Sequence, residues 1–312
     1  MAEHEEGTTP EAAPPTLTPS QVSGRTFRRY NLAALACGAA ALAAGAPWAL
    51  SGEGAQVAAH DPLGFARDAR WDDGKAEVAR YTAQRTIYGS PRDFELIRIA
   101  VKEPFDPAQR VKPDADRPGV LSAIKTVAVH EVPCGRAYTY RQQLICRLAQ
   151  ADPRRLLDAT SSSQEWCGST FVVLARKGAG FAREAHSYWD GQGDWADRIE
   201  GELWLEDQLA FTLRGLDPER APGKVRLLPS ILSNKAPATQ PLEATIECKA
   251  RGEEQVVPAG SFRCAHWVVT VGGQTRDYWV SEEGARPLVA FDDGVTRGQL
   301  RSLERAAYWV GR

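Results

Sequence analysis

The segment 161–169, Ser-Ser-Ser-Gln-Glu-Trp-Cys-Gly-Ser, comes nearest in the sequence to catalytic chemistry. A thiol hydrolase needs a cysteine thiolate beside an imidazole, and Cys167 with His186 or His266 would supply those groups. The order around Cys167 departs from papain-like enzymes, because Trp166 precedes the cysteine and no second cysteine follows. A buried or disulfide-bonded Cys167 beside a core tryptophan explains the segment better, and a thiol-dependent hydrolase is kept as the alternative function.

Other sequence patterns that carry catalysis or bind ligands are absent. The chain has no G-x-S-x-G elbow, no G-x-G-x-x-G and no P-loop spacing. The acidic pairs Asp292-Asp293 and Glu282-Glu283 fall in turn-like segments, where solvated charge accounts for them. The histidines are scattered and no cysteines form a C-x-x-C, so we predict no catalytic residue, no metal site and no cofactor. A binding role is favoured over enzymatic activity, which stays open.

Four cysteines are candidates for disulfide bonds. Cys134 and Cys146 flank a segment that can turn back on itself, while Cys248 and Cys264 lie in two strand-like runs with a Gly/Pro-containing connection. Each pair would close a short loop and would fit an oxidising compartment. Other pairings, and reduced thiols buried as small hydrophobic groups, remain open.

The N-terminal region predicts export. Residues 1–24 are rich in Glu and Pro and poor in large apolar groups, so we expect them to be disordered. Residues 25–51 hold three arginines followed by an uncharged Ala/Leu-rich run, which is typical of an export signal or membrane anchor. A cleaved signal ending near Ser51 fits best, with an uncleaved anchor or a twin-arginine signal as alternatives. The predicted location is the periplasm or the outer face of the inner membrane.

The bulk composition excludes one class of partner. The net charge is −2, from 38 basic and 40 acidic side chains that are interleaved along most of the chain. Nucleic-acid binding normally requires a concentrated basic face, so no nucleic-acid partner is expected. The 9 Trp, 8 Tyr and 9 Phe suit strands and the walls of apolar pockets.

The elements that must position these residues are mostly strands. Residues 77–88 alternate, with Ala79, Tyr81 and Ala83 on one side, and a turn leads to a second strand at 94–101 that places Ile97, Ile99 and Val101 together. We therefore expect an antiparallel hairpin. The sequence further predicts an irregular loop at 103–119, strands at 120–132, 137–148 and 170–175, and a short helix or turn at 153–157.

One helix and a β meander are predicted in the second half. Leu205, Leu209, Leu213 and Leu216 share one helical face, and a Pro-rich connection near 217–241 follows. The last block then alternates short strands with turns of hairpin composition. These strands are expected at 242–249, 260–271, 276–281 and 288–292.

This last block carries a short resemblance. Val257-Pro258-Ala259-Gly260-Ser261-Phe262, then Tyr278-Trp279-Val280 and Pro287-Leu288-Val289, resemble uncharacterised bacterial envelope proteins with a LolA/LolB-like curved half-barrel. The match covers about residues 240–300. It implies a curved sheet, and related half-barrels carry lipid or lipoprotein acyl chains on a concave apolar face.

We accordingly predict a mainly β protein, an antiparallel curved sheet or half-barrel with one or two covering helices. Residues 60–312 would form it, with two sublobes allowed about the 217–241 connection. The expected function is an exported cell-envelope binding or assembly protein that holds a lipid or other apolar ligand; a structural interaction protein without a small ligand is a further alternative. The predicted ligand-binding residues are Trp204, Leu209, Leu213, Trp267 and Trp279.

Overall fold

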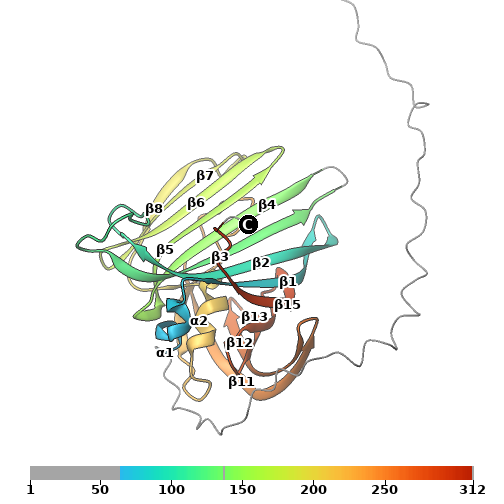
Figure 1. The fold of residues 1–312 in the computed structure, drawn as a ribbon. Helices are drawn as coiled ribbons and strands as arrows, with labels where there is room; N and C mark the ends of the chain where they lie inside the picture. Colours follow the sequence, from blue (N-terminus) through green and yellow to red (C-terminus); the bar gives the residue numbers. More distant parts are fainter. Residues whose placement is uncertain (1–63, 136–137, 311–312) are drawn as a thin grey trace, which may run out of the picture. The chain divides into compact units, whose positions relative to one another are not determined.

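The computed structural model, which describes residues 64–135 and 138–310, contains a single 15-stranded sheet (Figure 1). These residues belong to the unit Val57–Arg312. The strands follow the order β8-β7-β6-β5-β4-β3-β2-β1-β15-β14-β13-β12-β11-β10-β9, so the chain makes two antiparallel meanders that join where β1 pairs with β15. Only β9 and β10 are parallel neighbours. The predicted mainly β, curved antiparallel sheet is confirmed.

The strands of the first meander and the two short helical turns before it have the following bounds. They are α1 Gly64–Arg67, η1 Ala69–Asp72, β1 Ala76–Ile87, β2 Ser90–Phe105, β3 Leu121–Pro133, β4 Thr139–Ala149, β5 Asp152–Glu165, β6 Gly168–Lys177, β7 Gly180–Ser187 and β8 Trp195–Ile199. The second part comprises β9 Trp204–Leu205, η2 Glu206–Gln208, α2 Leu209–Gly215, β10 Gly223–Leu228, β11 Leu242–Val257, β12 Gly260–Val271, β13 Gln274–Ser281, β14 Leu288–Asp292 and β15 Thr296–Ala306.

Alternating side chains give the sheet an inner face, which we define as the face that packs against α2. In β4 every second residue is buried, from Tyr140 through Leu144 to Leu148, while Arg141 and Gln143 between them are exposed. This period of two is what a strand with one covered face requires. The inner-face residues of most strands join α2 in one hydrophobic core.

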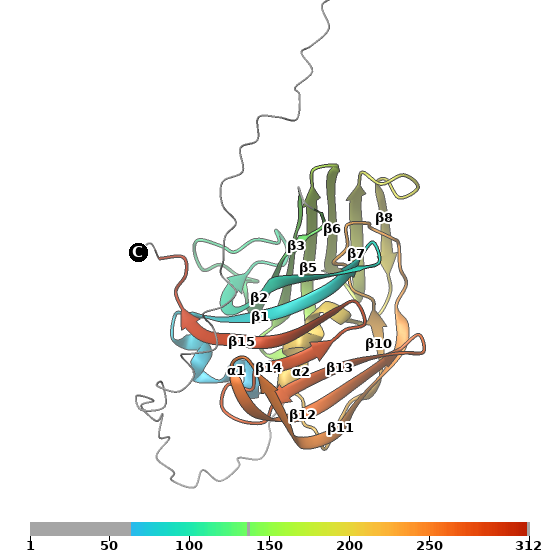
Figure 2. The ribbon, with the colours of Figure 1, turned by 90° about the vertical axis from the view of Figure 1, so that its right-hand side faces the viewer.

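The helix α2 covers part of the inner face. Figure 2 shows it between the strands of the first meander and those of the second, and it contacts β5 on one side and β13 and β14 on the other. Leu209 and Leu213 are fully buried. The predicted leucine face is therefore real, although the α-helix itself is only seven residues long, because Leu205 already ends β9 and Leu216 has extended backbone.

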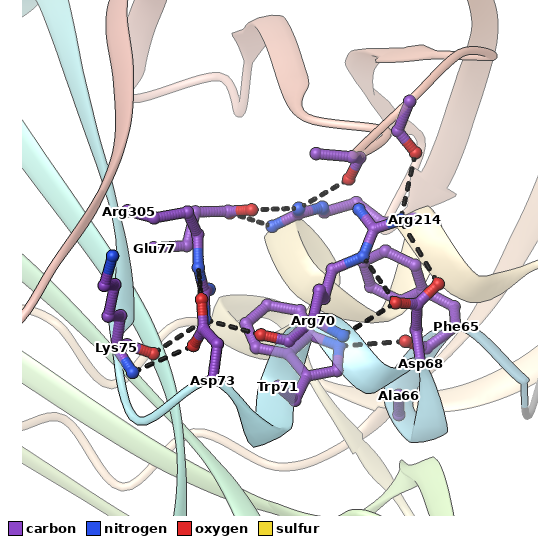
Figure 3. Close-up of polar contacts among 12 residues, drawn as sticks. Phe65, Ala66, Asp68, Arg70, Trp71, Asp73, Lys75, Glu77, Arg214 and Arg305 are labelled. Carbon is purple, nitrogen blue, oxygen red and sulfur yellow. Dashed lines mark hydrogen bonds and ion pairs between the residues drawn. The ribbon is translucent and has the colours of Figure 1, made fainter.

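A buried ion pair fixes α2 to the sheet. Arg214 Nη1 and Nη2 donate to Glu77 Oε1 and Oε2 on β1 at 2.6 and 2.9 Å. Figure 3 shows this pair close to Phe65 and Trp71 from the first two helical turns. Both aromatic rings pack against Phe211 of α2, with ring centroids 5.3 and 5.6 Å away.

The two outermost strands of the sheet are neighbours in the sequence. β8 ends at Ile199 and β9 begins at Trp204, so only residues 200–203 separate the two edges. Arg176 of β6 holds this link through two bonds to Glu202, at 2.5 and 2.8 Å, and Arg226 of β10 donates to the carbonyl of Glu200. The open sheet thereby curves until its two edges are bridged by one short loop.

Two predictions for the first meander are wrong. Residues 153–157, expected to be a helix or turn, lie in strand β5, and residues 103–105 of the expected loop still belong to β2. Leu156 and Leu157 are both buried, because Leu157 packs with Phe105 under the loop that follows β2 while Leu156 faces the main core. A strand covered on both faces loses its alternation and resembles a buried helix segment.

The remaining expectations for the strands differ in detail. The 77–88 and 94–101 hairpin is confirmed. Ile97, Ile99 and Val101 share one side of β2 as expected; that side is only half-buried, whereas Leu96 and Ala100 are buried on the inner face. β12 and β14 have the predicted bounds. β15 was missed because its inward residues include Thr296 and Gly298; the ring of Phe291 lies where a Cβ on Gly298 would be.

The predicted disulfides are not formed, and all five described cysteines are free thiols. Cys146 pairs with Thr126, whereas Cys134 lies just beyond the last β3–β4 pair, eight residue positions or roughly 26 Å from Thr126 along the strand. Cys264 opposes Glu253, about three positions from the partner of Cys248. Both separations exceed the reach of a disulfide. The sequence identified the correct hairpins but not their register.

The predicted disordered segment and export signal, residues 1–24 and 25–51, lie outside the described residues. Within the described part of the chain, no helix is long and apolar enough to cross a membrane.

Candidate functional site

A cavity of about 310 Å³ lies on the inner face, and we call it the polar cavity. Its walls come from β1–β4, from β13 and the β14–β15 turn, and from η2 and α2; residues 229–237, which we call the covering segment, complete it. The lining residues are Arg85, Arg98, Ala128, His130, Leu144, Glu206, Asp207, Ala210, Pro229, Ser230, Leu232, Ser233, Pro237, Arg276, Tyr278, Asp293, Val295 and Thr296.

Strand alternation positions the polar groups of the wall. Arg85 follows the inward residues Tyr81 and Ala83 of β1, and Arg98 lies between the buried Leu96 and Ala100 of β2. His130 of β3 pairs with Leu96 on one side and with Gln142 of β4 on the other. Each is a polar residue at a position of the strand where the fold requires a side chain to point inward.

His130 is the most unusual residue of the cavity. It is only 4% exposed, and neither ring nitrogen has a hydrogen-bond partner among the described residues. Burial, followed by the charges of Arg98 and Arg85, holds the pKa of His130 well below its usual value. The imidazole is therefore neutral near pH 7, with one N–H donor and one lone pair both unused. Buried polar atoms without partners cost free energy, so their presence in the lining of a cavity makes it a candidate binding site.

Two arginines place positive charge beside His130. Arg85 Nη1 donates to the neutral Gln142 Oε1 at 2.7 Å, and burial lowers the pKa of Arg85. Arg98 makes no hydrogen bond or ion pair with the described residues, and its Nε is buried. Its guanidinium carbon lies 5.1 Å from the ring centre of Phe291.

Acidic residues at the start of the helical region hold the covering segment. Asp207 accepts hydrogen bonds from Ser230 Oγ at 2.6 Å and from the Ile231 N–H at 2.9 Å. Glu206 accepts from the Ser230 N–H at 3.2 Å and from Arg276 Nε at 2.8 Å. Glu206 and Asp207 thus hold the covering segment in place through Ser230 and Ile231.

Burial also perturbs the acids of the cavity. It raises the pKa of Asp207 to about 6, against the lowering effect of the Ser230 and Ile231 bonds. It likewise raises the pKa of Asp293, which accepts bonds from the backbone N–H groups of Val295 and Thr296 at 2.9 and 2.7 Å. Perturbed groups gathered in a cavity are typical of functional sites.

The five residues predicted to bind a ligand lie elsewhere. Leu209, Leu213 and Trp267 are fully buried in the core, and Trp204 is half-buried on β9. Trp279 stacks on His266, with ring centroids 4.5 Å apart, and donates to Glu253. None of the five lines the polar cavity, and their role in binding stays a prediction.

The alternative nucleophile is not placed beside a base. Cys167 is exposed in the β5–β6 turn, and no hydrogen bond joins it to an imidazole of the described residues. His186 pairs with Phe171, about four positions or roughly 13 Å further along β6; His266 is in β12. Within the described chain, no three His, Cys, Asp or Glu side chains are arranged to hold a metal ion.

The residues of the polar cavity were missed, although the sequence held a signal for two of them. Arg85 shares the parity of Ala79, Tyr81 and Ala83, and His130 shares that of Ala128. A charged or polar side chain among the apolar, inward-facing residues of a strand is the pattern that points to such a site. Asp207 gave no such signal, because its position depends on contacts between distant segments.

Comparison with known proteins gives one reported structural similarity and no family. No family model matches the chain, and no curated protein matches it. One solved structure similar to this chain is that of a beta-barrel-like protein of domain of unknown function DUF1849 from Brucella abortus, with 10% sequence identity and a TM-score of 0.46. The alignment covers 75% of this chain and 98% of that one.

Proposed function

We propose that the protein is an exported binding protein of the cell envelope that holds a small molecule in the polar cavity. The observation that carries the proposal is the buried imidazole of His130, which lines the polar cavity and has no hydrogen-bond partner among the described residues. A ligand with hydrogen-bonding groups would satisfy both ring nitrogens, and Ala128, Leu144 and Leu232 offer apolar contact to the rest of it.

The size and lining of the cavity limit the class of ligand that it can hold. About 310 Å³ is at the lower end of the range of small-molecule sites, roughly 300–1,000 Å³. An acyl chain, which the resemblance to LolA/LolB-like half-barrels implies, would lie against Arg98 and Asp207. Since burying those charges against hydrocarbon is costly, an amphipathic small molecule fits better than a purely apolar chain or a complete phospholipid.

The binding proposal is tested with the full-length protein. Small molecules released by denaturation are identified by mass spectrometry, and a panel of metabolites is screened by thermal shift. Ala210 lines the cavity, so Ala210→Leu should fill it and reduce binding, whereas Ala238→Leu on the exposed surface is the matched control. A wild-type protein that releases no molecule and responds to no compound would refute the proposal.

Export is tested separately by cell fractionation. We expect the folded protein in the periplasm or at the outer face of the inner membrane, because residues 25–51 have the arginine-led apolar pattern of an export signal. Replacing Arg25, Arg28 and Arg29 by glutamine should retain the protein in the cytoplasm. Wild-type protein found in the cytoplasm with an intact N-terminus would contradict the export proposal.

A further inference from the structure

The charge distribution around the polar cavity leaves one guanidinium without an acceptor. Arg98 points from the middle of β2 to the inner face, where its Nε is buried and where no described residue accepts a hydrogen bond from its side chain. The aromatic face of Phe291 contacts it but offers no oxygen. An arginine has five N–H donors, and in the interior of a protein they require acceptors.

The nearby carboxylates do not fill this role. Asp207 already accepts bonds from Ser230 and Ile231, and Asp293 from Val295 and Thr296. Neither lies within ion-pair distance of Arg98. Both acids also bind protons more readily than usual, since burial raises their pKa values. They therefore bring negative charge to the cavity but leave the Arg98 guanidinium without a hydrogen-bond acceptor.

The other charged groups of the cavity are accounted for. Arg276 pairs with Glu206 at 2.8 Å, and these two charges cancel. Arg85 is bonded to an uncharged amide and adds a second positive charge. His130 is neutral, lines the cavity, and has no hydrogen-bond partner for either ring nitrogen among the described residues. The formal charges of Arg85 and Arg98 are balanced by those of Asp207 and Asp293, and what Arg98 lacks is a hydrogen-bond acceptor, which an occupant of the cavity would supply.

We propose that the ligand of the polar cavity is a small organic acid whose carboxylate binds the guanidinium of Arg98 and accepts a hydrogen bond from His130. This proposal rests on the proposed binding function. The planar fork of an arginine matches the two oxygens of a carboxylate. A single negative charge suits the cavity better than the two of a phosphate, because Asp207 and Asp293 also line it. The apolar body of the acid would lie along Leu144 and Leu232.

The experiment compares matched probes on the full-length protein by calorimetric titration. Octanoate, benzoate and indole-3-acetate are each paired with the corresponding primary amide, and octyl phosphate is included. We expect at least one acid to bind about tenfold or more tightly than its amide, as loss of a charge-assisted hydrogen bond predicts. Arg98→Gln should remove this preference, and Arg98→Lys, which keeps the charge without the fork, should retain part of it.

The control variant is Arg141→Gln, which changes an exposed arginine on the outer side of β4 and should leave the preference unchanged. The comparison of acid with amide on wild-type protein does not depend on the folding of any variant. Amides that bind as tightly as the acids, tighter binding of octyl phosphate, or a co-purifying molecule without an acidic group would overturn the assignment while leaving the binding function intact. If no acid, no amide and no co-purifying molecule binds, the binding function fails as well.

Discussion

The ion pair between Arg214 and Glu77 gives a quantitative prediction about what holds α2 in place. The side chains are only 6% and 5% exposed. Arg214 also donates to the carbonyl oxygens of Arg286 and Ala285, each at 2.9 Å. One guanidinium therefore satisfies a buried carboxylate and two backbone acceptors.

Replacing Arg214 by methionine keeps much of the apolar stem but leaves the Glu77 carboxylate buried without a partner. Removing one member of a buried pair costs about 3–5 kcal/mol, because the remaining charge is uncompensated. With Glu77→Leu added, the uncompensated carboxylate is gone, and the carbonyl oxygens of Arg286 and Ala285 lose only their bonds to Arg214. The double variant should therefore be more stable than Arg214→Met by about 2 kcal/mol or more.

Urea unfolding of the full-length protein, followed by circular dichroism, measures these differences. With a slope of about 2–3 kcal/mol per molar urea, Arg214→Met should lower the midpoint by roughly 1–2 M. Arg198→Met breaks an exposed pair with Glu200 and should change stability by less than about 1 kcal/mol. A loss below about 1 kcal/mol for Arg214→Met, or a double variant less stable than the single one, would refute the reasoning.

Two further predictions concern cysteine and aspartate chemistry. A thiol reagent mapped by peptide mass spectrometry should label the exposed Cys167 in the native protein but not Cys134, Cys146 or Cys264, whose pKa values burial raises; oxidised pairs would contradict the free thiols of the structure. For Asp207, the folded state retains a proton between about pH 4 and pH 6 that the unfolded state has released, so stability falls as the pH rises through that window. Asp207→Asn should reduce the fall measured by urea unfolding at about pH 4 and about pH 7, and an unchanged or larger fall would count against a raised pKa.

Local patterns were sufficient to predict much of the sheet. The turn Gly272-Gly273 ends β12, and the strands that follow it in the sequence, β13 and β14, were placed by the same alternation of apolar runs and turns. In β1, three small or aromatic inward residues set the parity correctly. These signals are local, because one covered face and a tight turn are enough to specify a hairpin.

The polar cavity could not be predicted in the same way. Arg98 lies in β2, which is partly covered on both faces. Because apolar residues occur on both sides of this strand, the sequence does not show that Arg98 points inward. Asp207 and Asp293 come from segments far apart in the sequence, and only the register of the whole sheet brings them to one space with His130. The same limit explains the disulfide predictions, which had the right hairpins and the wrong alignment.

The pairing of β1 with β15 has a consequence for how the protein is made. The strands β1 and β15 are adjacent, with Ala76 opposite Ala306, so the seam between the two meanders closes only when β15 has been synthesised. Until then β1 and β14 each present a row of unpaired backbone groups to the surroundings. A truncation that removes residues 296–306 would therefore open the middle of the sheet and not its margin, and a nascent chain exposes this seam until β15 has been synthesised.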